Sequence, residues 1–475
     1  MRVLVAIVLL LSTAFADFDV REHLSSSTRY EVSRDLGSKL FTEDPSPPEG
    51  CVPIHLNLVA RHGTRAPTKK RLKQLEELEV RLSELAKSMK SGEFFLPSGW
   101  EAAWRGKFVG GELTIPGEEE MFRLGQRIRE RFPEIFSGDY HPKISPILTT
   151  QVHRSAQSAV AFGMGLFSNK GSLGDGKHRA FSVISDNKTN DIHLRFHDCC
   201  QNYKESKAVR RPAVAKLQKK VYAQVSAAAT KRYKLPFTND DISSLWFLCK
   251  QEASVLEITT QACKLFLPEE VRLLEWADDV ELHHLKGYGD SINYKMGISL
   301  LSNVKEAIVS AMEESARDST DAKFLEKAKL RFAHAETVLP FACLLGLFLD
   351  GADVKVVQEE KSVAIPPKPP LPRLWRGSLV APFGGNTMLV LYKCSNQSPA
   401  FRVQAFHNEH PMIMPACNGS HFCPVDLFLD KIVSPHLKHS FEVVCFQPKK
   451  VSWFSSLLRL FGLRRKPSPD DDHEL

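Results

Sequence analysis

Apolar and polar residues alternate along the segment 51–60, and this spacing is typical of a strand with one buried side. The apolar positions are Val52, Ile54, Leu56 and Leu58. The alternation stops at residues 61–67, which read Arg-His-Gly-Thr-Arg-Ala-Pro. Glycine and proline mark a loop there. The pattern predicts a strand that carries a basic loop at its carboxyl end.

The spacing changes to threes and fours in the segment 70–90, which predicts an amphipathic helix. Its apolar positions are Leu72, Leu75, Leu78, Leu82, Leu85 and Met89. A coiled coil is the alternative interpretation of such a run. Residues 92–117 are loop-rich, and residues 117–131 have a helical pattern.

Two later segments repeat the order of strand, polar loop and helix. Residues 144–148 are apolar, residues 149–154 are polar, and a helix is expected over 155–167. A second strand is expected at 330–333, followed by a polar turn at 334–337 and an apolar helix up to Leu349. In α/β proteins, sites form where the carboxyl ends of strands meet such loops. We therefore expect the three loops to lie together.

The rest of the chain suggests a core interrupted by an insertion. Residues 190–295 are mostly helical, with the clearest patterns at 208–233 and 241–263, and we interpret them as a helical cap. The core is then discontinuous, formed by residues 17–189 and 296–450. A proline-rich linker or surface loop follows at 365–372. Two strands of an antiparallel pair are expected at 388–392 and 401–406.

The amino terminus resembles a secretory leader. Arg2 precedes an apolar run at 3–11, and Ala14 and Ala16 supply small residues for cleavage, so residues 1–16 are expected to be removed. A buried amino-terminal strand is the alternative. The chain has 475 residues, of which 43% are hydrophobic, as in ordinary globular proteins.

Cysteines and glycosylation motifs point to the same compartment. All ten cysteines follow the leader, and an even number in an exported protein favours disulfides, although spacing does not give their pairing. Zinc-ribbon spacing is absent, so no structural metal is expected. Asn187 and Asn418 begin sequons, and Asn396 begins a weaker one that is followed by Pro399. We expect a secreted protein or one of the endoplasmic reticulum lumen.

The formal net charge of +7 is moderate for this length. Basic residues are interleaved with acidic ones, so no nucleic-acid-binding stripe is indicated, whereas small anionic substrates are favoured. The tail at 451–475 combines aromatic and basic residues, and 451–466 fits a helix on a membrane surface, a helix docked on the body, or a disordered tail. The final Asp-His-Glu-Leu is close to retention tetrapeptides of the endoplasmic reticulum.

The loop 61–67 has the residues needed for transfer of a phosphoryl group. Arg61 and Arg65 can each bind two phosphate oxygens with a guanidinium fork. Neutral imidazole is a competent nucleophile, which makes His62 a candidate for attack on phosphorus. Gly63 permits a tight turn beside a ligand. The alternative is a basic surface loop with a chance histidine, which the bare tripeptide would favour over the full heptapeptide.

The two other loops supply complementary candidates. Arg154 lies at the expected start of a helix, where backbone amides favour an anion, although a lone arginine is more often solvated. His334 can bind a phosphoryl oxygen. Glu336 can protonate the alkoxide leaving group if its carboxyl is protonated, or it can cap the following helix.

Together, these motifs resemble those of the histidine acid phosphatases. Most members carry His-Asp at the last motif, whereas this chain has His334-Ala335-Glu336, as in the multiple inositol polyphosphate phosphatase branch. The segments 194–200 and 249–289 also resemble the cap of that branch. The resemblance covers about Val52 to Cys445.

The resemblance implies a mixed α/β sheet flanked by helices, a helical cap, and neither metal nor cofactor. It implies that His62 takes the phosphoryl group while Glu336 protonates the leaving oxygen, with the phosphate held by Arg61, Arg65, Arg154 and His334. Inositol hexakisphosphate and lower inositol polyphosphates are the implied substrates, which would make the protein a phytase.

Further substrate contacts are expected from residues beside the nucleophile. They are Thr64, Lys69 and Lys70. Both lysines also fit the solvated first turn of the following helix, an interpretation that is as good as substrate contact for Lys69 and better than it for Lys70. Two other functions stay open: a broad-specificity acid phosphatase or phosphoglycerate-type phosphatase on the same scaffold, and a catalytically silent lumenal binding protein.

Overall fold

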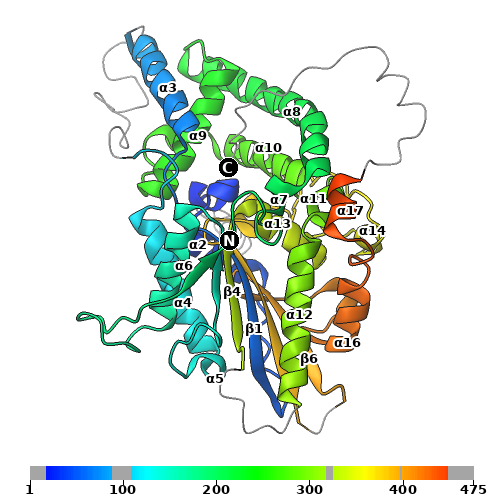
Figure 1. Cartoon of the computed structure of the whole chain (residues 1–475). Helices are drawn as coiled ribbons and strands as arrows, with labels where there is room; N and C mark the ends of the chain where they lie inside the picture. The colour runs from blue at the N-terminus through cyan, green and yellow to red at the C-terminus, as the bar shows by residue number, and fades with distance from the viewer. Residues whose placement is uncertain (1–17, 88–107, 317–324, 353, 396–397, 448–475) are drawn as a thin grey trace, which may run out of the picture.

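The computed structural model describes residues 18–87, 108–316, 325–352, 354–395 and 398–447, and it is built on one mixed sheet (Figure 1). The strands are β1 (Cys51–Arg61), β2 (Ile147–Thr149), β3 (Val183–Ser185), β4 (Ala328–Ala333), β5 (Asn386–Cys394), β6 (Phe401–His407), β7 (His410–Met412) and β8 (Phe422–Pro424). Their order is β3-β2-β4-β1-β5-β6-β7, and β8 also pairs with β6. This confirms the predicted mixed sheet and the antiparallel pair β5–β6.

One half of the sheet is parallel, and this half defines the site. Strands β3, β2, β4 and β1 run in the same direction, while β5 and its neighbours pair antiparallel. Arg61 pairs with Ala333, and Thr149 pairs with Phe332, so three adjacent strands end almost level. The loops that follow them leave from the same edge of the sheet.

Helices flank the sheet and also form a separate group beyond that edge. The α-helices are α2 (Tyr30–Leu40), α3 (Lys69–Lys87), α4 (Ile115–Arg131), α5 (Pro133–Phe136), α6 (His153–Leu166), α7 (Phe196–Cys199), α8 (Gln201–Tyr233), α9 (Asn239–Val255), α10 (Pro268–Lys286), α11 (Ile292–Lys295), α12 (Ile298–Ser315), α13 (Ala335–Leu344), α14 (Val354–Gln358), α15 (Gly377–Val380), α16 (Val425–Phe428) and α17 (Phe441–Phe446). Short 3-10 turns are η1 (Val20–His23), η2 (Ser25–Ser27), η3 (Ala262–Leu265) and η4 (Pro415–Cys417), and η5 (Leu429–Val433) is a π-helix.

The alternation in β1 places its side chains in two hydrophobic layers. Leu56, Leu58 and Ala60 pack with apolar residues of α4, α5 and α6, whereas Val59 belongs to the layer that contains α12 and α13. Figure 1 shows these groups of helices on opposite sides of the sheet. Successive strand residues point to opposite faces, so a strand between two layers is buried on both.

A third hydrophobic cluster forms the cap, which lies beyond the carboxyl edge of the parallel strands (Figure 1). It is formed mainly by α8, α9 and α10, as the helical pattern of 190–295 predicted. Helix α3 joins it because its buried leucines pack into the same cluster. These leucines are Leu75, Leu78, Leu82 and Leu85. The chain therefore passes from the loop 61–67 directly into the cap.

Some boundaries differ from the predictions. The predicted polar turn at 334–337 is wrong, because α13 already begins at Ala335 and Glu336 lies in its first turn. The helix expected over 241–263 ends at Val255 as α9. The leader 1–16, the tail 451–475, Asn396 and most of the segment 92–117 lie outside the described residues.

The ten cysteines include four disulfide pairs. The pairs are Cys51–Cys394, Cys200–Cys445, Cys249–Cys263 and Cys417–Cys423, and Cys199 and Cys343 are free thiols. Asn187 and Asn418 both lie on the surface. Among the described helices, none is both long and apolar enough to cross a membrane.

Candidate active site

The loops after β1, β2 and β4 meet at the carboxyl edge of the sheet. The backbone N–H of His62 donates to the carbonyl of Ala333 over 3.0 Å, and that of Thr150 donates to Phe332 over 3.1 Å. The rings of His62 and His334 lie edge to face, with centroids 5.7 Å apart. The structure therefore brings the three predicted loops together.

The imidazole of His62 is fixed in one tautomer. Its Nδ1–H donates to the carbonyl of Gly63 over 2.9 Å, which leaves Nε2 with a lone pair. Burial, followed by the positive charges of Arg154 and Arg61, holds the pKa of His62 well below its usual range. The ring is thus neutral at neutral pH, as a nucleophile must be.

The loop 61–67 is held against α4 by one buried carboxylate and a close backbone contact. The backbone N–H and the hydroxyl of Thr64 donate to Glu120 over 2.8 and 2.9 Å. A Cβ on Gly63 would lie 2.3 Å from the carbonyl oxygen of Gly117, so a larger residue would push the loop away from α4. The Thr64 hydroxyl therefore helps to hold the loop in place through Glu120.

Three arginines surround His62. Arg61, Arg65 and Arg154 are 1%, 7% and 8% exposed. Burial lowers the pKa of Arg61 and Arg154 to about 9 and that of Arg65 to about 10. Repulsion by the charge of Arg65 also lowers the pKa of Arg61 and of Arg154. A phosphate dianion would offset this repulsion, because guanidinium forks pair well with its oxygens.

Arg61 is positioned by the amino-terminal segment. Its Nη1 donates to the carbonyls of Ser26 and Ala381 over 2.6 and 2.8 Å, and its guanidinium lies 4.4 Å from the ring centroid of Phe383. Ser25, next to Ser26, donates to Asp279 of α10 over 2.8 Å. The segment that fixes Arg61 is thus itself fixed to the cap.

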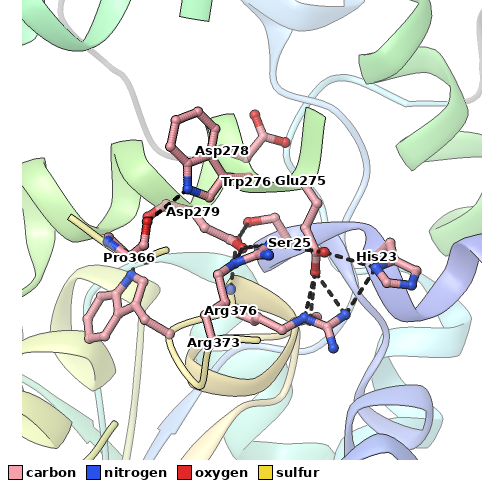
Figure 2. A network of polar contacts seen from close by, with 12 residues as sticks. His23, Ser25, Glu275, Trp276, Asp278, Asp279, Pro366, Arg373 and Arg376 are labelled. Atoms are coloured by element: carbon pink, nitrogen blue, oxygen red, sulfur yellow. Dashed lines mark hydrogen bonds and ion pairs between the residues drawn. The ribbon is translucent and has the colours of Figure 1, made fainter. Parts of the chain in front are cut away.

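Figure 2 shows the wider polar network around this attachment, between η1, α10 and the segment before α15. Glu275 pairs with His23 at 2.9 Å and with Arg376 at 3.0 Å. Asp279 pairs with Arg373 at 2.7 Å. Because both carboxylates are buried and paired, the network joins the cap, the amino-terminal segment and the core.

His334 also has a defined tautomer. Its Nε2 lies 3.0 Å from Nη1 of Arg195 and 3.0 Å from the hydroxyl of Thr150. Arginine can only donate, so Nε2 is the acceptor and the proton is on Nδ1. Burial and the charges of Arg154 and Arg195 hold the pKa of His334 well below its usual range. Neutral His334 can therefore donate one N–H to a bound oxyanion.

Glu336 lies in the first turn of α13 without capping it. Its Oε1 lies 2.7 Å from Nζ of Lys286, the last residue of α10, and both side chains are almost fully buried. Burial alone would raise the pKa of Glu336, but attraction to Lys286, His197 and Lys207 holds it well below its usual range. The carboxylate is therefore the resting form of Glu336.

A cationic groove begins beside this ion pair. A cavity of about 640 Å³ lies between α3, α8 and α10. Its cationic lining residues are Lys70, Arg71, Lys73, Lys207, Arg211 and Lys286, and its acidic lining residues are Glu77 and Glu281. Lys70 thus faces the groove, whereas Lys69 is exposed beside Gly110 and does not line it. A neighbouring cavity of about 180 Å³ is lined by Arg65 and Arg71.

Arg195, Lys207 and Lys286 contribute to the site but are not candidates from local sequence. They lie in the cap, more than 40 residues before Glu336, and reach the site only through the fold. One signal was present for Lys286: it follows Leu282 and Leu285 on the buried side of an amphipathic helix. A lysine at a core-facing position is unusual unless it is paired.

Comparisons with known proteins agree with this geometry. The model of the family "Histidine phosphatase superfamily (branch 2)" matches residues 54–408. The human relative, multiple inositol polyphosphate phosphatase 1, is 27% identical over 414 residues, which cover 82% of this chain and 81% of the relative.

Solved structures share the fold at low identity. The phytase from D. castellii has a TM-score of 0.67 at 18% identity, with 90% of this chain and 88% of that chain covered. The multiple inositol polyphosphate phosphatase from Bifidobacterium longum, solved with inositol hexasulfate, has a TM-score of 0.62 at 17% identity. The coverage is 87% of this chain and 98% of that one.

Proposed function

This chain belongs to branch 2 of the histidine phosphatase superfamily, and from that premise we propose that it removes phosphates from inositol hexakisphosphate and lower inositol polyphosphates. The observation that carries the proposal is the neutral imidazole of His62, with Nε2 unprotonated, among Arg61, Arg65 and Arg154. Such a site pairs a nucleophile with the charges that a phosphoryl group needs.

In the first step, Nε2 of His62 attacks phosphorus in line with the ester bond. The P–N bond forms as the P–O bond breaks, and the electron pair of the P–O bond stays on the leaving oxygen. Glu336, in its protonated form, gives its proton to that oxygen, so that a neutral alcohol leaves. The three arginines and the Nδ1–H of His334 hold the phosphoryl oxygens.

In the second step, water attacks the phosphohistidine. Glu336 is then a carboxylate and accepts a proton from the attacking water. The P–N electron pair returns to His62, and inorganic phosphate leaves. The same glutamate thus serves first as the acid and then as the base, and it carries a proton again when phosphate leaves.

The cationic groove supports a substrate with several phosphates. One of its six cations, Lys286, pairs with Glu336, so the groove begins at the proposed acid, and its cations can bind phosphates that are not being cleaved. The human relative is named for inositol polyphosphates, and the Bifidobacterium structure holds inositol hexasulfate, an analogue with six anionic groups. A single small monoester would leave most of the groove unused.

We also propose the domain division and the location. Residues 190–295 form the cap over a core of residues 17–189 and 296–450, with α3 packed against the cap. Disulfides form and persist in oxidising compartments, and Asn187 and Asn418 are accessible for glycosylation. These features support a secreted protein or one of the endoplasmic reticulum lumen.

Phosphate release from inositol hexakisphosphate and from a simple aryl phosphate tests the proposal. We expect a higher kcat/KM for the hexakisphosphate, and loss of both activities in His62→Ala. A strong preference for the aryl ester would favour a broad-specificity acid phosphatase. Unchanged turnover in the variant would refute the mechanism, and an inactive wild-type protein would favour a binding protein.

A further inference from the structure

The ion pair between Lys286 and Glu336 opposes the proposed role of Glu336 as a general acid. A general acid must carry a proton before it can donate one. The ammonium 2.7 Å away stabilises the carboxylate, which lacks that proton. Both side chains are buried, at 2% and 4% exposure, so solvent screens the pair only weakly. A mechanism that uses Glu336 as an acid therefore needs a way to weaken this pair.

Lys286 contacts both the acid and the groove. It ends α10 against Glu336 and also lines the 640 Å³ cavity, together with Lys207 and Arg211 of α8. Burial, followed by repulsion from the positive charge of Lys286, lowers the pKa of Lys207 to about 8. A second phosphate of a bound substrate would therefore lie next to the ammonium that now pairs with Glu336.

We propose that Lys286 is a positioning residue shared between Glu336 and an anion in the groove, so that a substrate with a second phosphate releases Glu336 to act as the acid. This inference rests on the proposed function. It explains a preference of the enzyme for polyphosphates by catalysis as well as by binding, because the second phosphate leaves Glu336 able to act as the acid.

The proton comes from the substrate. A phosphate monoester loses its second proton with a pKa of about 6, so polyphosphates carry monoprotonated groups near neutral pH. When one enters the groove, its oxygen replaces the Glu336 carboxylate as the partner of Lys286, and its proton passes to Glu336. Glu336 then gives that proton to the ester oxygen as the P–O bond breaks and His62 forms the P–N bond.

Several other charged or titratable groups face Glu336. They are Arg61 at the end of β1, Arg65 in the loop after it, Arg154 of α6, His197 of α7, Tyr203 and Lys207 of α8, and His334 before α13. The arginines hold the phosphate under attack. Among the described residues, Lys286 alone both forms an ion pair with Glu336 and lines the groove, so it is the residue to change.

The substitution Lys286→Met removes the charge but keeps the length of the side chain. Without the ammonium, burial raises the proton affinity of Glu336, which then carries a proton without a second phosphate. We expect kcat for an alkyl monophosphate to rise at neutral pH. The alkaline limb of its profile of kcat against pH should move up by about one pH unit. The preference in kcat for inositol hexakisphosphate should fall about tenfold.

Lys73→Met is the matched control. Lys73 is an exposed lysine of the same groove whose charge is not among those that face Glu336. This variant should raise KM for the hexakisphosphate and leave the alkaline limb in place. Loss of both activities in parallel in Lys286→Met, with no movement of the limb, would show a structural role only and overturn the proposal.

The wild-type enzyme supplies a second test that does not depend on folding of a variant. The profile of kcat against pH reports groups in the enzyme–substrate complex. We expect the alkaline limb for inositol hexakisphosphate to lie about one pH unit above that for an alkyl monophosphate. Coincident limbs would overturn the role of Lys286. Failure to hydrolyse the hexakisphosphate at all would instead refute the proposed function.

Discussion

Nη1 of Arg195 lies 3.0 Å from Nε2 of His334, and this contact sets which nitrogen of the imidazole carries the proton. The hydroxyl of Thr150 lies at the same distance from Nε2. His334 therefore directs an N–H, rather than a lone pair, away from these partners. In the proposed mechanism a phosphoryl oxygen needs such a donor, so a residue of the cap would determine how a residue of the core binds substrate.

Replacing Arg195 with methionine should weaken transition-state binding for every ester. Loss of a charged hydrogen bond costs about 1.5–3 kcal/mol, which corresponds to about a 10- to 100-fold fall in kcat/KM. Thr150→Val keeps Arg195 as the partner of His334, so this variant should lower kcat/KM by less. Nitrogen-15 shifts of His334 would report the tautomer. Unchanged kinetics and shifts in Arg195→Met would refute the positioning role.

Glu336→Gln should discriminate between leaving groups. An alkoxide needs a proton as it leaves, whereas a nitrophenolate leaves without one. We expect turnover of inositol hexakisphosphate to fall about 100-fold or more, and that of nitrophenyl phosphate to fall far less. The melting temperature should be recorded alongside, because glutamine leaves Lys286 without its carboxylate partner. Equal losses on both esters would indicate that Glu336 has a structural role.

Adjacent lysines at the start of α3 provide a matched pair. Both lysines are exposed, but Lys70 lines the groove and Lys69 does not. Lys70→Met should raise KM for inositol hexakisphosphate about three- to tenfold, because one phosphate contact is lost at a solvent-exposed site. Lys69→Met should leave KM within about twofold. Equal effects would show that the groove does not bind the substrate.

The network in Figure 2 predicts how stability depends on pH. Burial alone would raise the pKa of Glu275, but the charges of Arg376, His23 and Arg373 hold it below its usual range. A carboxyl with a lower pKa in the folded chain stabilises the fold above about pH 4.5, and this contribution is lost as the pH falls toward the folded pKa.

Melting temperatures of wild type and Glu275→Gln from pH 7 to pH 3 check this prediction. The variant should melt lower at pH 7, because Arg373 and Arg376 lose a buried partner. The difference should shrink as the pH falls, since protonation removes the same charge from the wild-type protein. A difference that stays constant over this range would contradict the assignment.

The parts of the site that follow strands could be predicted from sequence, because a local pattern marks them. The alternation in 51–60 ends at the basic loop, and the ends of β2 and β4 repeat the same order of elements. The relationship of Lys286 to Glu336 joins residues 50 positions apart, and no local pattern gives that contact. The spacing of α3 predicted its helix, but not that its leucines pack into the cap.

The most direct test of the account is to identify the residue that carries the phosphoryl group. Wild-type enzyme mixed with phosphorus-32-labelled inositol hexakisphosphate, quenched within milliseconds in alkali and digested, should yield one labelled peptide, with the label on His62. The label should be acid-labile and absent from His62→Ala. A label on another residue, or turnover with no labelled protein at any time, would contradict the account.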